Sequence, residues 1–201
     1  MGKKLQRYKM IIDRAASALI IELGFERLNN NIIVERTSLE QEIINKFYKN
    51  DDQLRIAGMR YLADIWCNKV RVEAENINDK AERLRYIITE FAFGTDSYTE
   101  ALSNYIEALY NIIKKTDGSM CFIDELLNIY KMYVDLFISC IASPNINYSS
   151  EMHVCAWILV VISDGIHIQS LLKNKLIDKE IAVKILVSTV KSVFTTIESK
   201  S

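Results

Sequence analysis

Proline and glycine are scarce in this chain, with one proline and six glycines in 201 residues. A protein of many short strands needs more turn-forming residues, so this scarcity argues against a β fold and favours long helices. The sequence also lacks strand-like alternation, internal repeats and low-complexity stretches. Its apolar residues recur at helical spacing, and we predict an all-α protein of about nine helices.

Cysteines are also few and far apart. Cys67, Cys121, Cys140 and Cys155 form no C-x-x-C pair, and only two histidines accompany them. These spacings are not those of a zinc site, and the cysteine density is too low for a disulfide-bonded miniature domain. We interpret the four residues as buried free thiols and predict neither a metal nor a cofactor. Reduced thiols and no recognisable signal peptide suggest the cytoplasm.

Long apolar runs and an excess of charge of one sign are absent as well. The longest apolar run, from Val154 to Ile162, is nine residues, whereas a helix that spans a membrane needs ~20. Half of the residues are hydrophobic and the net charge is -1, so a substantial core is expected and disorder is not. The overall charge does not indicate a nucleic-acid partner, which would have to bind a local basic patch.

Catalytic motifs are missing too. The sequence has no P-loop, no dinucleotide-binding glycine pattern, no H-E-x-x-H and no G-x-S-x-G. His153 and His167 lie on one predicted helix, about 21 Å apart by helical rise, which is too far for one site. We interpret His167 and the nearby Asp164 as a surface or interface pair. An enzyme is therefore not expected.

The N-terminal region has a recognisable layout. A helical pattern at residues 11–23 stops at Gly24. A short apolar piece at residues 32–34, a polar turn at residues 37–38 and a short helical piece at residues 40–46 follow. Helix, short helix, turn, short helix is the order of a helix-turn-helix unit.

The order of residue types in this region resembles the N-terminal domain of the TetR family of transcriptional regulators. The residues that carry the resemblance are Ile12 and Ala15-Ala16, Gly24-Phe25, Ile33-Val34, Thr37-Ser38-Leu39, Tyr48, and Asp51, Asp52 and Leu54. The order of the later helices resembles the family as an architecture. The resemblance implies a DNA-binding domain at residues 1–50 and a helical ligand-binding and dimerisation domain at residues 51–201.

Such a protein would bind double-stranded DNA as a homodimer, with two helix-turn-helix heads on a palindromic operator. In the recognition piece, Gln41 and Asn45 can pair with adenine and Glu42 with cytosine. Residues 1–9 carry four basic residues and no acid, which we interpret as a basic arm that is either frayed or in contact with phosphates. The predicted phosphate contacts are Lys3, Lys4, Lys46 and Lys49. Asn29 or Asn30 is predicted to cap the second helix and to present its N-terminal N–H groups to a phosphate.

The recognition piece departs from the family pattern. The family usually has serine and then lysine or a small residue at its start and tyrosine near its end, whereas this chain has Glu40-Gln41-Glu42 and Asn45. Phe47 replaces a histidine and Asp51 replaces a lysine. Acids at the end that faces the groove repel the DNA backbone. The alternative function is a degenerate relative that has lost operator binding and acts as a small-molecule-binding or protein-interaction module.

Aromatic residues are frequent in the helices predicted after residue 51, where the family encloses its ligand. Aromatic and apolar walls suit a small hydrophobic effector, although each residue also fits an ordinary core position. The predicted lining is Trp66, Tyr86, Phe91, Tyr105, Phe122, Tyr130, Tyr133 and Phe137. By this interpretation the effector shifts the spacing of the two heads and releases a repressor from its operator.

The two helices predicted at residues 150–173 and 178–200 have wide apolar faces. A helix that is hydrophobic all round must be covered on all sides, and a second copy of the chain is a natural cover. The predicted dimer interface consists of Trp157, Val161, Gly165, Ile168, Leu172, Ile185 and Val193. Burial of both helices within one monomer is the alternative.

Overall fold

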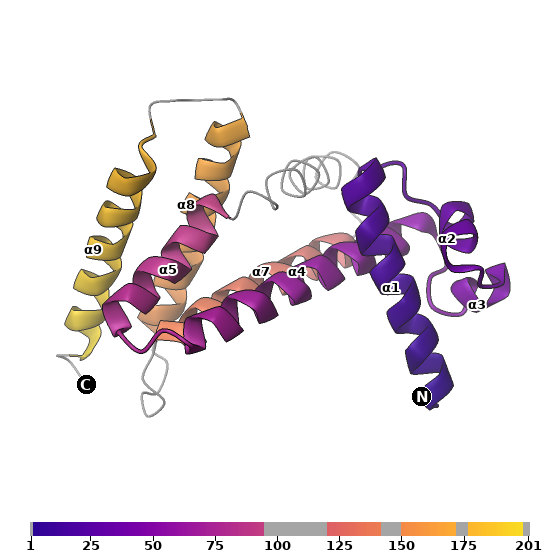
Figure 1. Cartoon of the computed structure of the whole chain (residues 1–201), viewed down its shortest axis with the longest axis horizontal. Coiled ribbons are helices and arrows are strands. Elements are labelled where there is room, and N and C mark those ends of the chain that lie inside the picture. The colour runs from indigo at the N-terminus through magenta and orange to yellow at the C-terminus, as the bar shows by residue number, and fades with distance from the viewer. Residues whose placement is uncertain (1, 95–119, 142–149, 172–176, 199–201) are drawn as a thin grey trace. The chain divides into compact units, whose positions relative to one another are not determined.

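The computed structural model describes residues 2–94, 120–141, 150–171 and 177–198, and every regular element in these ranges is an α-helix (Figure 1). The helices are α1 (Lys3–Leu23), α2 (Asn30–Thr37), α3 (Gln41–Asn45), α4 (Asp51–Glu75), α5 (Lys80–Phe93), α7 (Met120–Ile141), α8 (Ser150–Leu171) and α9 (Lys179–Glu198). The all-α prediction is confirmed. The predicted number of about nine helices is not tested, because residues 95–119 lie outside the described residues.

The chain divides into two compact units. The first comprises residues 1–65 and 97–129, and the second comprises residues 66–96 and 130–201. Each unit therefore contains one part of α4 and one part of α7. The predicted boundary after residue 50 separates a DNA-binding domain from a ligand-binding domain. It remains a prediction, because the two compact units are defined by their packing and not by their function.

Helix α1 begins earlier than the sequence interpretation allows. The predicted basic arm at residues 1–9 is wrong as a description of the backbone, because the helix starts at Lys3. No proline or glycine interrupts the sequence between Lys3 and Leu23, so nothing stops the helix from extending toward the N-terminus. The ammonium group of Lys9 pairs with Asp13 one turn later at 2.6 Å and supports this segment. The helix ends at Gly24, whose φ of 87° is one that residues with a side chain rarely adopt.

In the first unit, α1 crosses the first part of α4 at close range. A Cβ atom at Gly58 would lie 2.7 Å from Cδ1 of Ile20 and 3.1 Å from the backbone and side chain of Ala16. Both of these α1 residues are fully buried or nearly so. The absence of a side chain at position 58 therefore allows the two helices to approach each other.

In the second unit, α5 packs against both α8 and α9, which also contact each other. Helix α5 begins with a capped end, where the Asp79 side chain accepts a hydrogen bond from the backbone N–H of Glu82 at 2.8 Å. Leu84, Ile87 and Ile88 on its inner face are buried.

The described thiols agree in part with the sequence interpretation. Cys67 and Cys155 are buried and Cys140 is half-buried, and none of the three forms a disulfide within the described part of the chain. Burial raises the pKa of both the Cys140 and the Cys155 thiols. The side chain of Cys121 lies outside the described residues.

Candidate nucleic-acid interface and ligand site

The turn between α2 and α3 has the geometry that joins two short helices. Ser38 adopts a left-handed conformation with φ 56°, and its N–H donates to the carbonyl of Val34 at 2.8 Å. The Thr37 hydroxyl donates to the carbonyl of Ile33 at 2.7 Å and accepts from the N–H of Leu39 at 3.3 Å. The polar pair at residues 37–38 is thus the turn that the sequence predicts.

The recognition helix α3 is anchored by one side chain and accessible through the others. Ile44 is fully buried, as is Ile33 of α2, so each short helix is fixed to the core of the first unit. Glu42 and Asn45 are exposed, and Gln41 is half-exposed. The Gln41 amide donates to the Asn45 side-chain oxygen at 2.9 Å, which brings the two predicted adenine-reading side chains together.

The N-terminus of α2 is closed by groups from the chain itself. The Asn29 side chain caps the helix by accepting from the N–H of Ile32 at 3.1 Å. The N–H of Asn30 donates to a carboxylate oxygen of Asp51 at 2.9 Å. The carboxylate of Asp51 therefore already accepts from one of the backbone N–H groups that were predicted to meet a phosphate.

The basic residues predicted to contact phosphates are accessible. Lys3, Lys4, Lys46 and Lys49 are all exposed. The ammonium group of Lys4 lies 5.7 Å from the centre of the Tyr8 ring on the next turn of α1. Two exposed acids lie at the other end of the recognition helix, with Glu40 at the N-cap position of α3 and Glu42 in its first turn.

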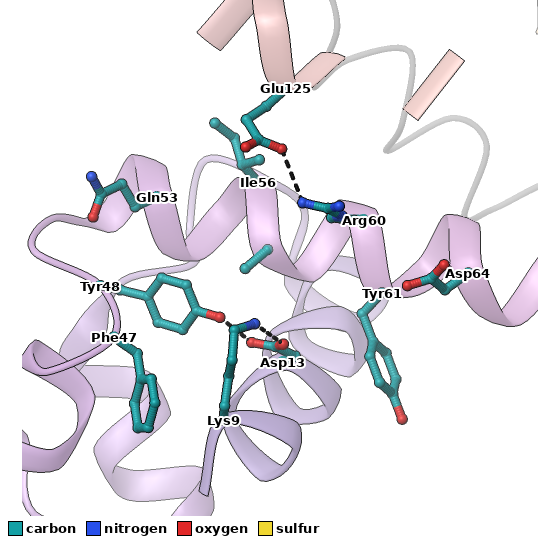
Figure 2. A pocket seen from close by; sticks show the side chains of 11 residues that line it. Lys9, Asp13, Phe47, Tyr48, Gln53, Ile56, Arg60, Tyr61, Asp64 and Glu125 are labelled. Atoms are coloured by element: carbon teal, nitrogen blue, oxygen red, sulfur yellow. Dashed lines mark hydrogen bonds and ion pairs between the residues drawn. The ribbon is translucent and has the colours of Figure 1, made fainter. Parts of the chain in front are cut away.

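The end of the motif is tied back to α1. The buried Tyr48, three residues after α3, donates its hydroxyl to Asp13, which also pairs with Lys9 (Figure 2). Burial, followed by the hydrogen bond to Asp13, raises the pKa of the Tyr48 phenol, so it remains a donor. The orientation of α3 is thus coupled to α1 by a charged hydrogen bond.

The aromatic residues predicted to line a ligand site form a packed cluster in the second unit. Trp66 of α4 meets Phe91 of α5 edge to face, with ring centres 4.9 Å apart, and meets Tyr133 of α7 at 5.4 Å. Phe91 also contacts Phe137, which is almost fully buried. Tyr130 lies at the edge of this cluster, next to Tyr133. We call these five residues the aromatic cluster.

Polar groups border the aromatic cluster on α8. Trp157 stacks on Tyr130 with ring centres 6.0 Å apart, and the Tyr130 hydroxyl donates to Asp164 at 2.7 Å. Burial raises the pKa of the Asp164 carboxyl, while this hydrogen bond acts in the opposite direction. Burial also lowers the pKa of His167 to about 4, so it is neutral at physiological pH. Its Nε2 atom is buried and, within the described part of the chain, has no hydrogen-bond partner.

Sequence reasoning missed these polar groups. The interpretation of His167 and Asp164 as a surface or interface pair is wrong as a pairing, because Asp164 bonds to Tyr130 and the half-buried His167 forms no hydrogen bond with it among the described residues. Glu90 of α5 is 6% exposed, and burial raises its pKa. Its Oε2 atom lacks a hydrogen-bond partner among the described residues. An acid in an apolar helical face was the available signal for Glu90, and helical spacing from Trp157 was the signal for Asp164.

The other predicted ligand residues lie elsewhere or are not described. Tyr86 of α5 is half-buried and donates its hydroxyl to Glu73 of α4. Tyr105 lies outside the described residues, as does the side chain of Phe122.

One face of α8 is apolar and exposed in the part of the chain that the structure describes. Ile158 is 54% exposed, Val161 is 62% exposed, and Val154 and Ile168 are also exposed. A Cβ atom at Gly165, on the same face, would meet nothing within 4 Å. On α9, Ile185 is 59% exposed. We call these six residues the apolar face.

The other predicted interface residues are not exposed in this way or are not described. Trp157 is half-buried by its stacking on Tyr130 within the same chain. Leu172 and the side chain of Val193 lie outside the described residues. Among the described helices, the segment Ser150–Gln169 is long and apolar enough to cross a membrane, although 33% of it is buried within the chain.

Several solved structures are similar to this chain over nearly its whole length. A protein assigned to the TetR family of transcriptional regulators, from a Rhodococcus species, has a TM-score of 0.58 at 18% identity, covering 93% of this chain and 98% of its own. A transcriptional regulator from Saccharomonospora viridis, in complex with choline, has a TM-score of 0.59 at 14% identity, covering 92% and 96%. The regulator FadR from Bacillus subtilis, in complex with stearoyl-CoA, has a TM-score of 0.55 at 12% identity, covering 89% and 95%. No protein-family model matches the chain, and no curated protein matches it in sequence.

Proposed function

We propose that this chain, which has the fold of the TetR-family transcriptional regulators, is a ligand-responsive repressor that binds a palindromic operator as a homodimer in the cytoplasm. The observation that carries the proposal is the accessible helix α3, held by the buried Ile44 after the left-handed turn at Ser38. A short exposed helix in this position is the element that enters the major groove in helix-turn-helix proteins. No catalytic role is proposed, and the similar solved structures are those of regulators rather than enzymes.

Base contacts are assigned to the polar side chains of α3. Gln41 and Asn45 each have a side-chain amide that can form two hydrogen bonds with adenine, and the bond between them holds both at one edge of the helix. Lys46 and Lys49 follow within one turn and are exposed toward solvent, where they can neutralise phosphates. Lys3 and Lys4 supply further charge from the first turn of α1.

A second copy of the chain is the proposed cover for the apolar face of α8 and α9. Exposed aliphatic side chains in a contiguous stripe cost free energy in water, and closed two-fold dimers are the commonest way to remove such a stripe. Among the described residues, none lies within 4 Å of a Cβ atom built at Gly165 in this stripe, which leaves room for a helix from the partner. A membrane would be the other apolar cover, and it is an outcome that the test can detect.

An effector site is proposed at the border of the aromatic cluster, where Tyr130 contacts Trp157 and Asp164 and where His167 follows Asp164 by one turn of α8. Aromatic walls with a few fixed polar groups are typical of small-molecule sites. A buried nitrogen without a partner, such as Nε2 of His167, gains a hydrogen bond when a suitable ligand enters. The relatives bound to choline and to stearoyl-CoA illustrate that this fold accepts ligands of very different size.

The second candidate function is a relative that binds a ligand or a protein and no longer reads DNA. The specific observation in its favour is the acidic character of the DNA-facing end. Glu40 and Glu42 flank the start of α3, and the Asp51 carboxylate accepts a hydrogen bond from the N–H of Asn30 in α2. These carboxylates weaken the attraction for phosphates that drives association with DNA.

Fluorescence anisotropy with the DNA upstream of its own gene separates the two functions. We expect binding that weakens strongly between about 50 mM and about 200 mM salt, because several counterions are released from DNA. Absence of any salt-dependent binding to this DNA, by a protein that is folded by circular dichroism, would favour the second function.

Analytical ultracentrifugation tests the dimer separately. We expect a dimer for the wild-type chain and a monomer for Val161→Asp, which places a charge in the centre of the apolar face. A wild-type monomer at micromolar concentration contradicts the proposed dimer, and recovery of the wild-type chain in the membrane fraction contradicts the cytoplasmic location.

A further inference from the structure

A separate cavity of about 410 Å³ lies within the first unit, beside the motif that presents α3 (Figure 2). Its walls come from α1, the segment after α3, the first part of α4 and the start of α7. The volume is within the range of small-molecule sites in proteins. The aromatic cluster contributes no residue to this cavity, because all of its members belong to the second unit.

The charges that line the cavity leave one carboxylate unpaired. Lys9 is neutralised by Asp13 at 2.6 Å, and Arg60 is neutralised by Glu125 at 3.3 Å. Asp64, the fifth charged residue of the wall, is exposed and forms no hydrogen bond or ion pair with any described residue. The described residues of the wall therefore carry one negative charge in excess, which attracts a cation in preference to an anion.

Aromatic rings provide a second feature that favours a cation. Phe47, Tyr48 and Tyr61 all line the cavity. The ammonium group of Lys9 already lies 5.5 Å from the centre of the Tyr48 ring, so this part of the cavity tolerates a cation on an aromatic face. Tyr61 lies one turn before Asp64 on α4, which puts a ring and a free carboxylate beside each other (Figure 2).

We propose that this cavity binds an organic cation, whose ammonium group lies between Asp64 and Tyr61 and whose apolar part lies against Ile56 and Ala57 of the same wall. The wall combines a carboxylate, aromatic faces and a short aliphatic surface, which is the chemistry that recognises alkylammonium groups. This site is additional to the effector site proposed in the second unit.

Occupancy of the cavity would be transmitted to α3 through a short covalent route. Phe47 and Tyr48 follow the last residue of α3, Asn45, by two and three positions. The Tyr48 hydroxyl is bonded to Asp13, which is itself part of the wall. A ligand that contacts these side chains biases the orientation of the recognition helix, and this second step rests on the proposed DNA binding.

Isothermal titration calorimetry with benzyltrimethylammonium chloride tests the site on the full chain. We expect binding by the wild type and a loss of about tenfold in affinity for Asp64→Asn, which removes the unpaired charge and keeps the shape. Asp124→Asn is the matched control, since Asp124 is an exposed acid on α7 beside the lining residue Glu125. It should bind the probe like the wild type. Tyr61→Leu is the second variant and should also weaken binding, with circular dichroism to verify folding.

Three outcomes would overturn the proposal. The first is equal affinity of the wild type and Asp64→Asn for the probe, and the second is tighter binding of benzoate than of the cation. The third is a loss of probe affinity in Tyr130→Phe with none in Asp64→Asn, because the cation would then be bound in the second unit. Calorimetry with the probe does not depend on DNA, so failure of the proposed operator binding leaves this result readable. Anisotropy with and without the probe then measures the coupling, expected at about fivefold or more.

Discussion

The carboxylate of Asp51 accepts a hydrogen bond from the backbone N–H of Asn30 at 2.9 Å, so the first residue of α4 closes the first turn of α2. Family members usually have a lysine in the position of Asp51. A helix N-terminus attracts anions, and in this chain the anion is supplied internally. The bond connects α2 to α4, and under the proposed DNA binding its negative charge would lie near a DNA phosphate.

Replacing Asp51 with asparagine should strengthen DNA binding. Asparagine keeps an oxygen that can accept from the N–H of Asn30, while the negative charge is removed. We expect the affinity for DNA to rise about two- to fivefold at low salt, as measured by fluorescence anisotropy. Asp124→Asn, which removes an equal charge from α7, should leave the affinity unchanged. Equal or weaker binding by Asp51→Asn would mean that no phosphate approaches α2.

Asn45 and Lys46 are adjacent in sequence but should affect DNA binding in different ways. Asn45→Ala removes a base contact, so it should weaken binding to the operator by about 1–3 kcal/mol and leave binding to unrelated DNA unchanged. Lys46→Ala removes a phosphate contact, so it should weaken binding to every sequence and reduce the salt slope by about one. Anisotropy with operator and unrelated duplexes at several salt concentrations measures both effects. If both variants lower affinity for the two duplexes equally, α3 does not read bases.

Gly58→Ala should destabilise the first unit. The added methyl group would clash with Ile20 and Ala16 of α1, and overpacking of this kind costs about 1–3 kcal/mol of unfolding free energy. Urea denaturation followed by circular dichroism measures the change. Gly2→Ala is the control, because a Cβ atom there meets nothing within 4 Å and its φ of -67° is compatible with a side chain. If Gly58→Ala unfolded at the same urea concentration as the wild type, α1 and α4 would not be in close contact at Gly58.

His167 should make the folded chain sensitive to mild acid. Burial lowers its pKa from 6.5 to about 4, so the unfolded chain binds this proton more readily than the folded chain. The stability that it contributes is therefore complete above about pH 6.5 and is lost progressively as the pH falls toward about 4. We expect the loss to be about 2 kcal/mol between pH 7.5 and 5.

Comparison with His167→Gln isolates this contribution. Burial raises the pKa values of Asp164 and Glu90, so these two acids stabilise the folded chain as the pH falls, which is opposite to the effect of His167. Both acids are present in the wild type and in the variant, so their contribution cancels in the comparison. The quantity to measure is the difference between the two proteins in urea unfolding at each pH. A difference that does not change with pH would exclude His167 as the titrating group.

Local sequence signals predicted the helices well where a cap or a breaker marks the boundary. Asn29 begins α2, Gly24 ends α1, and the pair at residues 37–38 forms the turn, because each position needs a side-chain cap or an unusual backbone angle. The start of α1 was predicted poorly. A run of lysines resembles a flexible arm in composition, but its residues favour a helix once Lys9 can pair with Asp13.

The candidate sites were harder to predict, because their key contacts join distant segments. Asp51 and Asn30 are 21 residues apart, and Tyr48 and Asp13 are 35 residues apart. Neither pair has a periodic pattern that a single sequence reveals. The aromatic residues were recognised by type, yet helical spacing alone did not predict that Tyr86 bonds to Glu73 while Phe91 joins the aromatic cluster.

Under the proposed dimer, the exposed aliphatic stripe on α8 makes the behaviour of the protein depend on its concentration. Val154, Ile158 and Val161 are exposed in a lone chain, and association removes them from water only when another copy is close enough to meet. At low copy number we expect single chains that melt at a lower temperature and bring only one head to DNA. Dilution would thus weaken DNA binding as an inducer does. The amount of dimer that can bind DNA would depend on the square of the concentration of single chains.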